Sequence, residues 1–222
     1  SPVFSRGFFR SWKQGAKLCR KYRFTPKEAF RLGCFHPEFR DSEVFVSRVD
    51  MTRRQEQLNP PSFAPWLKNK VLFYQYCHAL NIGTPTVYAY GGSRSGAWIN
   101  ARGQSLRSLD DKRHLLTHEL PEQFLLKPLI GAYGAGIERF TRENGLLKDS
   151  RGNERNYDVL ISELDSGGEF LLQQVLENHP SLSGLTGCRG LQALRVITHV
   201  DEAGQTQLLH CHLKVISRAD IL

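Results

Sequence analysis

The chain has 222 residues, of which 40% are hydrophobic and 23% are charged, and this composition excludes an intrinsically disordered protein. It contains no run of about 18 apolar residues, so no transmembrane helix is expected, and the N-terminus lacks the apolar segment of a signal peptide. The five cysteines are scattered and form no CxxC pair, which argues against a disulfide framework and a structural zinc site. We therefore expect a globular protein of a reducing compartment, the cytoplasm.

The net charge of +8 is concentrated near the N-terminus. Residues 1–31 hold nine basic side chains and one acidic side chain, Glu28, whereas the remaining residues hold 21 of each sign. Such a basic arm can bind anionic lipid, nucleic acid or an acidic protein. The rest of the chain is neutral and carries no nucleic-acid recognition motif, so no specific nucleic-acid partner is expected. The arm could instead bring the protein to an anionic membrane, at its inner face.

The first predicted element is a basic amphipathic helix. Apolar residues recur in it at spacings of four and three, with Arg and Lys between them: Phe8, Trp12, Ala16 and Cys19. A helix that packs this stripe on the body of the protein has such a pattern, and so does a helix that lies on a membrane surface. We favour packing, because most apolar stripes face a core.

Three further helices are predicted before the first strand. Thr25 and Pro26 are typical of a helix start, residues 42–57 predict a second helix, and residues 70–80 predict a third with Asn69 as its N-cap. Residues 86–90 then predict a strand. The glycine-rich segment 91–96 lacks the Gly-Lys-Ser/Thr ending of a P-loop and is interpreted as a turn. We assign residues 1–65 to a helical basic region and 66–120 to a linker or small α/β subdomain.

The region 121–222 is dense in predicted strands. They cover residues 124–126, 137–140, 170–174, 193–200 and 207–216, with a helix over 157–164. Asn144 and Gly145 predict a tight hairpin, and Ala203 and Gly204 lie in the turn between the last two strands.

Lys127 ends the first of these strands and is followed by a glycine-rich loop, residues 131–136. Glycine lets backbone N–H groups approach an anion closely, and a lysine ammonium supplies a point charge for phosphate oxygens. About 35 residues later, the strand 170–174 runs into polar residues that end at His179 and Pro180. A hinge of this kind can offer backbone groups to an adenine edge, and Glu177 could accept hydrogen bonds from ribose hydroxyls. The alternatives are an ordinary hairpin loop and an ordinary edge strand.

The order of these features resembles the ATP-grasp fold, and more narrowly the sugar-transfer associated ATP-grasp family. The most similar stretches are residues 124–137, 171–180 and 194–198, and residues 70–90 resemble the segment that precedes the nucleotide-binding part. The resemblance covers roughly residues 68–214. It implies an α+β fold of two α+β subdomains with mainly antiparallel sheet, preceded here by the helical N-terminal arm, and it makes 121–222 the nucleotide-binding region.

The resemblance also implies an ATP-dependent ligase. A carboxylate would attack the γ-phosphate of ATP to give an acyl phosphate, and an amine or similar nucleophile would displace the phosphate. Lys70 and Lys127 would hold phosphates, and Arg195 would stabilise negative charge, so that Arg195 and Lys127 are the predicted catalytic residues. The loop would close over the phosphates through Gly131, Ala132, Tyr133, Gly134, Ala135 and Gly136. The hinge would bind adenine and ribose through Gln173, Gln174, Val175, Leu176 and Glu177.

Two of these roles have simpler structural alternatives. Lys70 could be an exposed first-turn lysine, and Glu177 could cap a turn. Arg195 lies in an apolar strand, where an unpaired charge would be costly, so we expect it to have a partner.

The sequence departs from the family pattern at the metal site. ATP-grasp enzymes hold Mg²⁺ through acidic and Asn side chains on late strands, and few acids follow Glu177 in this chain. The metal ligands are therefore unknown, and we expect the C-terminal part of the fold to be missing. The first expectation is a ligase that uses ATP and Mg²⁺, with an unidentified carboxylate and nucleophile, in polysaccharide or cell-envelope biosynthesis. The alternatives are a catalytically inactive nucleotide-binding or interaction protein, and a binder of nucleic acid or membrane surface through the basic arm.

Overall fold

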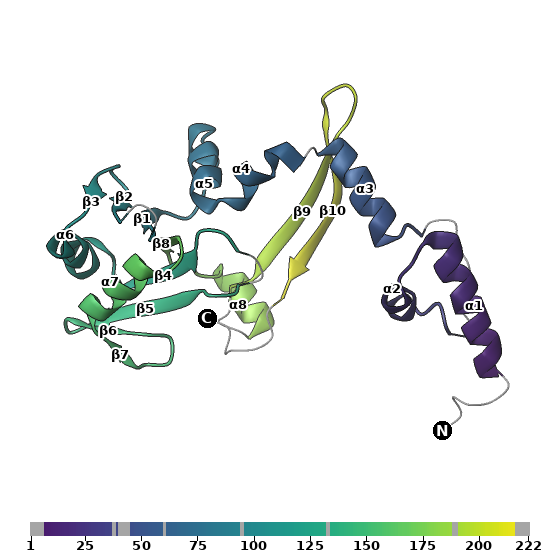
Figure 1. Ribbon diagram of the computed structural model, residues 1–222, viewed down its shortest axis with the longest axis horizontal. Coiled ribbons are helices and arrows are strands. Elements are labelled where there is room, and N and C mark those ends of the chain that lie inside the picture. Colours follow the sequence, from purple (N-terminus) through teal and green to yellow (C-terminus); the bar gives the residue numbers. More distant parts are fainter. Residues whose placement is uncertain are drawn as a thin grey trace. The chain divides into compact units, whose positions relative to one another are not determined.

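A computed structural model describes residues 7–36, 39, 45–59, 61–93, 96–131, 134–187 and 191–215. The chain divides into two compact units, residues 1–65 and 66–222 (Figure 1). Within the described residues, no helix has the length and apolar character needed to span a membrane.

The first unit is helical. It contains α1 (Gly7–Tyr22), α2 (Pro26–Arg31), α3 (Arg48–Leu58) and the short helix η2 (Pro61–Phe63), and α4 (Ala64–Lys68) runs across the boundary. Thr25 caps α2 as predicted, in a capping box with Glu28. The predicted helix over 42–57 starts later than expected: Ser47 is its N-cap, because its own backbone is extended and its hydroxyl accepts the Asp50 N–H.

The buried face of α1 differs from the predicted stripe. Ser11, Gly15 and Leu18 are buried, whereas Trp12 is 57% exposed. The packing face is therefore one residue away from the expected one, and the favoured interpretation is wrong for Trp12. The reason is close packing: a Cβ atom on Gly15 would lie 2.2 Å from the Phe35 ring, so this position admits only glycine. The side chain of Phe8 lies outside the described residues.

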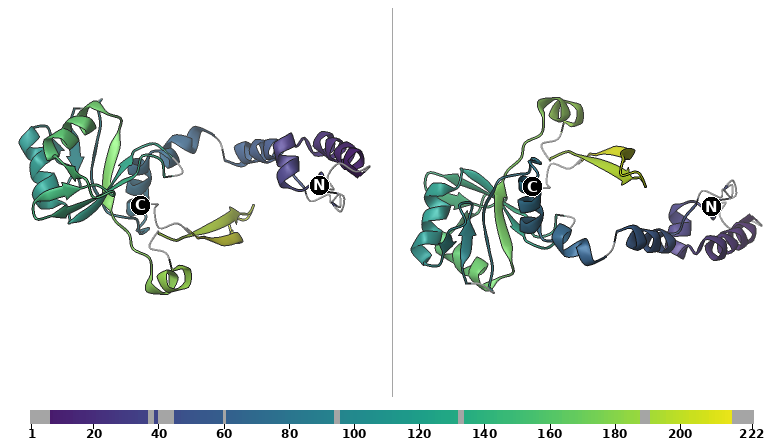
Figure 2. Two further views of the ribbon diagram at one scale, coloured as in Figure 1. Left: turned by 90° about the horizontal axis from the view of Figure 1, so that it is seen from below. Right: turned by 90° about the horizontal axis from the view of Figure 1, so that it is seen from above.

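The second unit is built on an eight-stranded sheet, which both views of Figure 2 show as one twisted layer. The strand order is β3-β2-β1-β8-β4-β5-β6-β7, and every neighbouring pair is antiparallel. The strands are β1 (Val87–Gly91), β2 (Trp98–Asn100), β3 (Ser105–Leu106), β4 (Gln123–Pro128), β5 (Glu138–Glu143), β6 (Leu146–Lys148), β7 (Glu154–Arg155) and β8 (Phe170–Gln174). The predicted α+β class with mainly antiparallel sheet is confirmed. So is the hairpin at Asn144 and Gly145, where both residues have positive φ.

Helices cover the two faces of this sheet. On one face, α6 (Leu109–His114), the π-helical turn η3 (Leu115–Glu119) and α7 (Tyr157–Ser166) bury the main core. Its largest fully buried members are Trp98, Leu116, Leu120, Phe124, Phe140, Leu147, Leu160, Ile161 and Leu172. On the other face, α5 (Lys70–Ala79) packs Val71 against Leu129 and Leu171. Asn69 caps α5 as predicted.

One charged side chain lies within the main core. Lys112 of α6 is 3% exposed, and its ammonium lies 2.7 Å from the Asp165 carboxylate of α7. The indole N–H of Trp98 donates to the same carboxylate at 2.9 Å. Asp165 therefore joins α6, α7 and β2 at one point.

After β8 the chain forms α8 (Pro180–Thr186) and a second, two-stranded sheet of β9 (Ala193–Val200) and β10 (Thr206–Lys214). The predicted strands and the turn at Ala203 and Gly204 are confirmed. Every side chain of β9 is exposed, and β10 has only Leu213 partly covered.

Candidate nucleotide-binding site

Lys127 lies on the sheet face that α5 covers. It pairs with Leu171 across β4 and β8, and alternation along a strand places it on the opposite face from Phe124 and Leu126. Burial lowers the pKa of the Lys127 ammonium, and the neighbouring Lys70 ammonium lowers it further. Two cations thus stand together in a partly desolvated place, which is unfavourable unless an anion joins them.

Lys70 lies in the first turn of α5, 57 residues before Lys127 in the chain. Its ammonium donates to the carbonyl oxygens of Pro128 at 2.8 Å and Leu129 at 3.2 Å, and it reaches that of Gly131 at 3.4 Å. Its backbone N–H also donates to the Leu129 carbonyl. Burial lowers the pKa of this ammonium as well. Lys70 is therefore not a freely solvated first-turn lysine, because it holds the start of the glycine loop beside Lys127.

The glycine loop turns back onto the end of β4. Gly134 and Gly136 have φ of +78° and +70°, in the left-handed region that favours glycine. A Cβ atom on Gly136 would lie 2.9 Å from the Pro128 ring, so the loop returns close to the residue after Lys127. Ala132 and Tyr133 lie outside the described residues; Gly131 and Ala135 are exposed.

The hinge follows β8. Gln173 is 1% exposed, and its side-chain oxygen accepts a hydrogen bond from the Tyr74 hydroxyl at 3.4 Å. The Gln174 side chain accepts from the Thr86 N–H at 3.1 Å, so this amide oxygen fastens β8 to the start of β1. Val175 is partly buried, whereas Leu176 and Glu177 are exposed and lie in a segment without regular structure.

Arg195 is in β9, in the two-stranded sheet, opposite His212. Its side chain is exposed, so the expected cost of a charge in an apolar strand does not arise. The burial of Arg195 that we inferred from its apolar neighbours was therefore wrong. It came from assuming burial on one side of a strand that exposes both sides.

Sequence reasoning missed Tyr74 and the pocket beside it. Tyr74 and Lys70 are four residues apart, a spacing that places them on the same face of α5 and that could have indicated Tyr74. An open pocket of about 550 Å³ lies between α5 and strands β1 and β2. Its lining includes Val71, Tyr74, Thr86 and Tyr90, so it adjoins both the α5 packing face and the hinge end of β8.

The described residues contain no group of three or more His, Cys, Asp or Glu side chains that could hold a metal ion. They supply positive charge for phosphates through Lys70 and Lys127 and no set of protein ligands for Mg²⁺. A nucleotide-bound Mg²⁺ is often held mainly by phosphates and water with only one or two carboxylates.

The lysines and the hinge flank a covered stretch of β8, in which Leu171 is 0% and Gln173 is 1% exposed. The two lysines lie at the Pro128 end of β4, and the hinge lies at the other end of β8. From Leu171 to the hinge is about 10–16 Å at a rise of about 3.3 Å per residue. That span suits an extended nucleotide, with its phosphates at the lysines and its base at the hinge.

The family model described as sugar-transfer associated ATP-grasp matches residues 51–220. No curated protein and no solved structure matches the chain. The matched region holds Lys70, Lys127, the glycine loop and the hinge, and it covers more than three quarters of the sequence. The chain therefore belongs to the sugar-transfer associated ATP-grasp family.

Proposed function

We propose that this protein binds ATP at Lys70, Lys127 and the glycine loop and uses it to activate a carboxylate. Membership in an ATP-grasp family supports an ATP-dependent ligase-like function. The observation that carries the proposal is the convergence of Lys70 and Lys127. Each has a lowered pKa, and they meet where the loop begins although they come from different elements.

In the proposed complex, each part of the site has one task. Lys127 contacts phosphate oxygens, and Lys70 keeps the loop backbone in place and adds positive charge beside the phosphates. The backbone from Gly131 to Gly136 donates N–H groups to the phosphates. Residues 175–177 offer backbone groups to adenine, and Glu177 accepts from ribose. Fixed positive charge of this kind stabilises phosphoryl transfer because it needs no rearrangement when charge develops.

The proposed reaction transfers the γ-phosphate of ATP to a carboxylate oxygen and releases ADP. A nucleophile such as an amine then attacks the acyl carbon and releases phosphate. Arg195 is a proposed contributor to charge stabilisation. Surface-polysaccharide or cell-envelope biosynthesis is the proposed setting, and it rests on the family alone.

Calorimetric titration with the non-hydrolysable analogue AMP-PNP and Mg²⁺ tests the nucleotide step. We expect saturable binding, and weaker binding of GMP-PNP because the hinge reads the base edge. The ligase step is tested by incubating ATP, Mg²⁺ and hydroxylamine with a panel of carboxylates, since hydroxylamine converts an acyl phosphate into a hydroxamate. Failure to bind AMP-PNP would refute the ATP-binding proposal. Binding without hydroxamate for any carboxylate would favour an inactive nucleotide-binding protein.

We also propose that α1 binds an anionic membrane surface. Trp12 is 57% exposed on a helix that also exposes Lys13, Lys17 and Arg20. An exposed indole between cations is typical of interfacial helices, because the ring inserts at the headgroup level while the cations meet anionic lipid.

Replacing Trp12 with alanine is expected to weaken partitioning onto phosphatidylcholine/phosphatidylserine vesicles roughly fivefold, since less apolar area is then buried in the interface. Sedimentation with vesicles measures it. Trp66→Ala is a matched control, because Trp66 is 59% exposed and lies outside α1. Equal loss in both variants, or no loss in Trp12→Ala, would contradict a membrane role for α1.

A further inference from the structure

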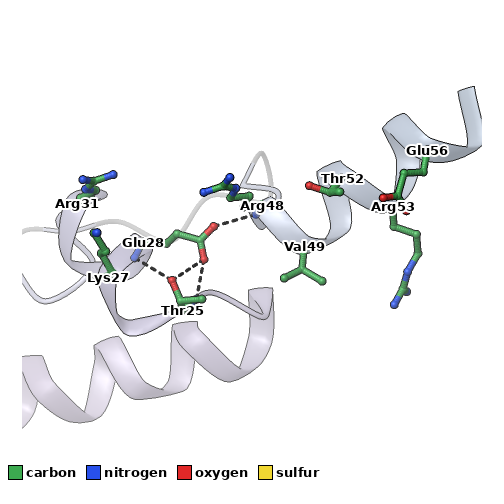
Figure 3. A pocket seen from close by; sticks show the side chains of 9 residues that line it. All are labelled: Thr25, Lys27, Glu28, Arg31, Arg48, Val49, Thr52, Arg53 and Glu56. Atoms are coloured by element: carbon green, nitrogen blue, oxygen red, sulfur yellow. Dashed lines mark hydrogen bonds between the residues drawn. The ribbon is translucent and has the colours of Figure 1, made fainter. Parts of the chain in front are cut away.

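A cationic pocket, separate from Lys70 and Lys127, lies in the first unit between α2 and the start of α3. It has a volume of about 510 Å³, and its lining includes Lys27, Arg31, Arg48 and Arg53 against only two acids, Glu28 and Glu56. Figure 3 shows Lys27, Arg31 and Arg48 on the same side of the helices as the Glu28 carboxylate, whereas Arg53 points the other way. Most of this lining precedes residue 51, where the family match begins, so the pocket is not part of the nucleotide site.

The Glu28 carboxylate contributes one negative charge to the pocket, and hydrogen bonds hold it in place. One oxygen accepts from the Thr25 backbone N–H at 2.7 Å and the Thr25 hydroxyl at 2.8 Å, and the other accepts from the Arg48 backbone N–H at 3.0 Å. These bonds lower the pKa of Glu28, with the Thr25 backbone as the largest cause. Glu28 thus fixes α3 to α2 and holds the Arg48 main chain beside the cations of α2.

The cationic side chains form no close ion pair, although the Glu28 carboxylate interacts electrostatically with Arg48. Among the described residues, no carboxylate lies within the 4.0 Å of an ion pair from Lys27, Arg31 or Arg48; the neighbouring Arg23 does form such a pair, with Asp50. Lys27 and Arg31 are four residues apart on one helix face, where like charges repel each other. The described lining therefore has four cations against two carboxylates, so its charge is positive by two.

We propose that this pocket binds a phosphate monoester. Such a group carries a charge of about −1.5 to −2 and three acceptor oxygens, which matches the excess positive charge and the many donors of this lining. The two arginines can each offer paired N–H groups to oxygen atoms, and Lys27 adds a point charge. The backbone N–H groups of Arg48 and Asp50 are already bonded to Glu28 and Ser47, so the side chains supply the recognition. The volume leaves room for the body of a small phosphorylated molecule or for a lipid headgroup.

The test is a titration with inorganic phosphate, followed by the backbone amide signals of residues 25–31 and 48–56 in ¹⁵N-labelled protein. We expect saturable shifts, and affinity at least tenfold weaker in Arg31→Gln/Arg48→Gln, because two charge-assisted contacts are lost. Arg54→Gln/Arg107→Gln removes the same charge from exposed positions and should change affinity less than about twofold, since neither residue lines the pocket. Arg31→Lys/Arg48→Lys keeps the charge and should retain most binding. The amide spectrum of Arg31→Gln/Arg48→Gln itself shows whether that variant is folded.

Two further experiments distinguish a lipid phosphate from a soluble phosphorylated ligand. Pelleting that is stronger with phosphatidylcholine/phosphatidic acid vesicles than with phosphatidylcholine/phosphatidylserine vesicles, with this difference lost only in Arg31→Gln/Arg48→Gln, would identify a lipid phosphate monoester. Binding of inorganic phosphate without that selectivity would identify a soluble ligand. Equal weakening in both glutamine variants, or tight binding of a DNA oligonucleotide that both weaken equally, would overturn the proposal. Lys127→Ala should leave these amide shifts unchanged, so failure here and failure at the ATP site are distinguishable.

Discussion

Replacing Lys127 with alanine is expected to remove most of the stabilisation that ATP gives this protein. A ligand at a hundredfold excess over its Kd stabilises the folded state by about 2.7 kcal/mol. A hydrogen bond to a charged group contributes about 1.5–3 kcal/mol, so its loss weakens binding roughly tenfold to a hundredfold. At the same ATP concentration, a hundredfold weaker site would gain only about 0.4 kcal/mol. Thermal unfolding with ATP and Mg²⁺ measures the difference.

Lys68→Ala is the matched control, because Lys68 is exposed and lies two residues before Lys70. It should keep the full ATP-dependent shift. An unchanged shift in Lys127→Ala, with ATP bound by the wild type, would place the phosphates elsewhere and refute the assignment of Lys127. A shift absent from the wild type would refute ATP binding itself.

The lowered pKa of Lys127 also predicts how binding depends on pH. The unfolded chain has an ordinary lysine pKa of about 10.4, and the folded value lies below it. At a pH between the folded-state pKa and the unfolded-state pKa, the unfolded chain binds more protons than the folded protein. The free-energy cost of burying the charged lysine is therefore complete below the folded-state pKa, and it disappears as the pH rises towards the unfolded-state pKa. Phosphate favours the charged form, so ATP affinity should fall across the same alkaline window. Lys127→Arg stays charged there and should reduce the fall, with Lys70 contributing what remains.

The largest effect on stability is expected for Asp165→Ala. The variant would leave the Lys112 ammonium buried, with its side chain 4% exposed, and would remove the acceptor of the Trp98 indole. Removing one partner of a buried ion pair costs about 3–5 kcal/mol, and because the Asp165 side chain is 36% exposed we expect about 3 kcal/mol. Urea unfolding, monitored by tryptophan fluorescence and circular dichroism, measures the free energy of unfolding.

The same helix, α7, also provides a matched control. Asp158 of α7 also pairs with a residue of α6, Arg113, at 2.8 Å, but both side chains are more than 40% exposed. Asp158→Ala should therefore cost only about 0–1 kcal/mol. Adding Lys112→Met to Asp165→Ala should recover part of the loss, since no buried charge then remains. Equal losses in the two single variants would show that burial of Lys112 does not matter.

The sequence determined the local structure of this protein. Thr25 and Asn69 start their helices, and Asn144 and Gly145 make the predicted hairpin, because caps and tight turns depend on neighbouring side chains and on allowed backbone angles. The lysine before a glycine loop was visible for the same reason, since both belong to one continuous stretch. From these features the order of elements followed, and with it the resemblance to the family.

Only the tertiary structure decided which distant residues meet and which side chains are covered. Lys70 and Lys127 converge because α5 packs on β4 and β8, and Lys112 lies in the core because Asp165 reaches it from another helix. Trp12 is exposed because Phe35 packs against Gly15, and no spacing within α1 could show this. Local patterns fix backbone conformation through short-range sterics and hydrogen bonds, whereas burial and charge pairing depend on contacts between segments far apart in the chain.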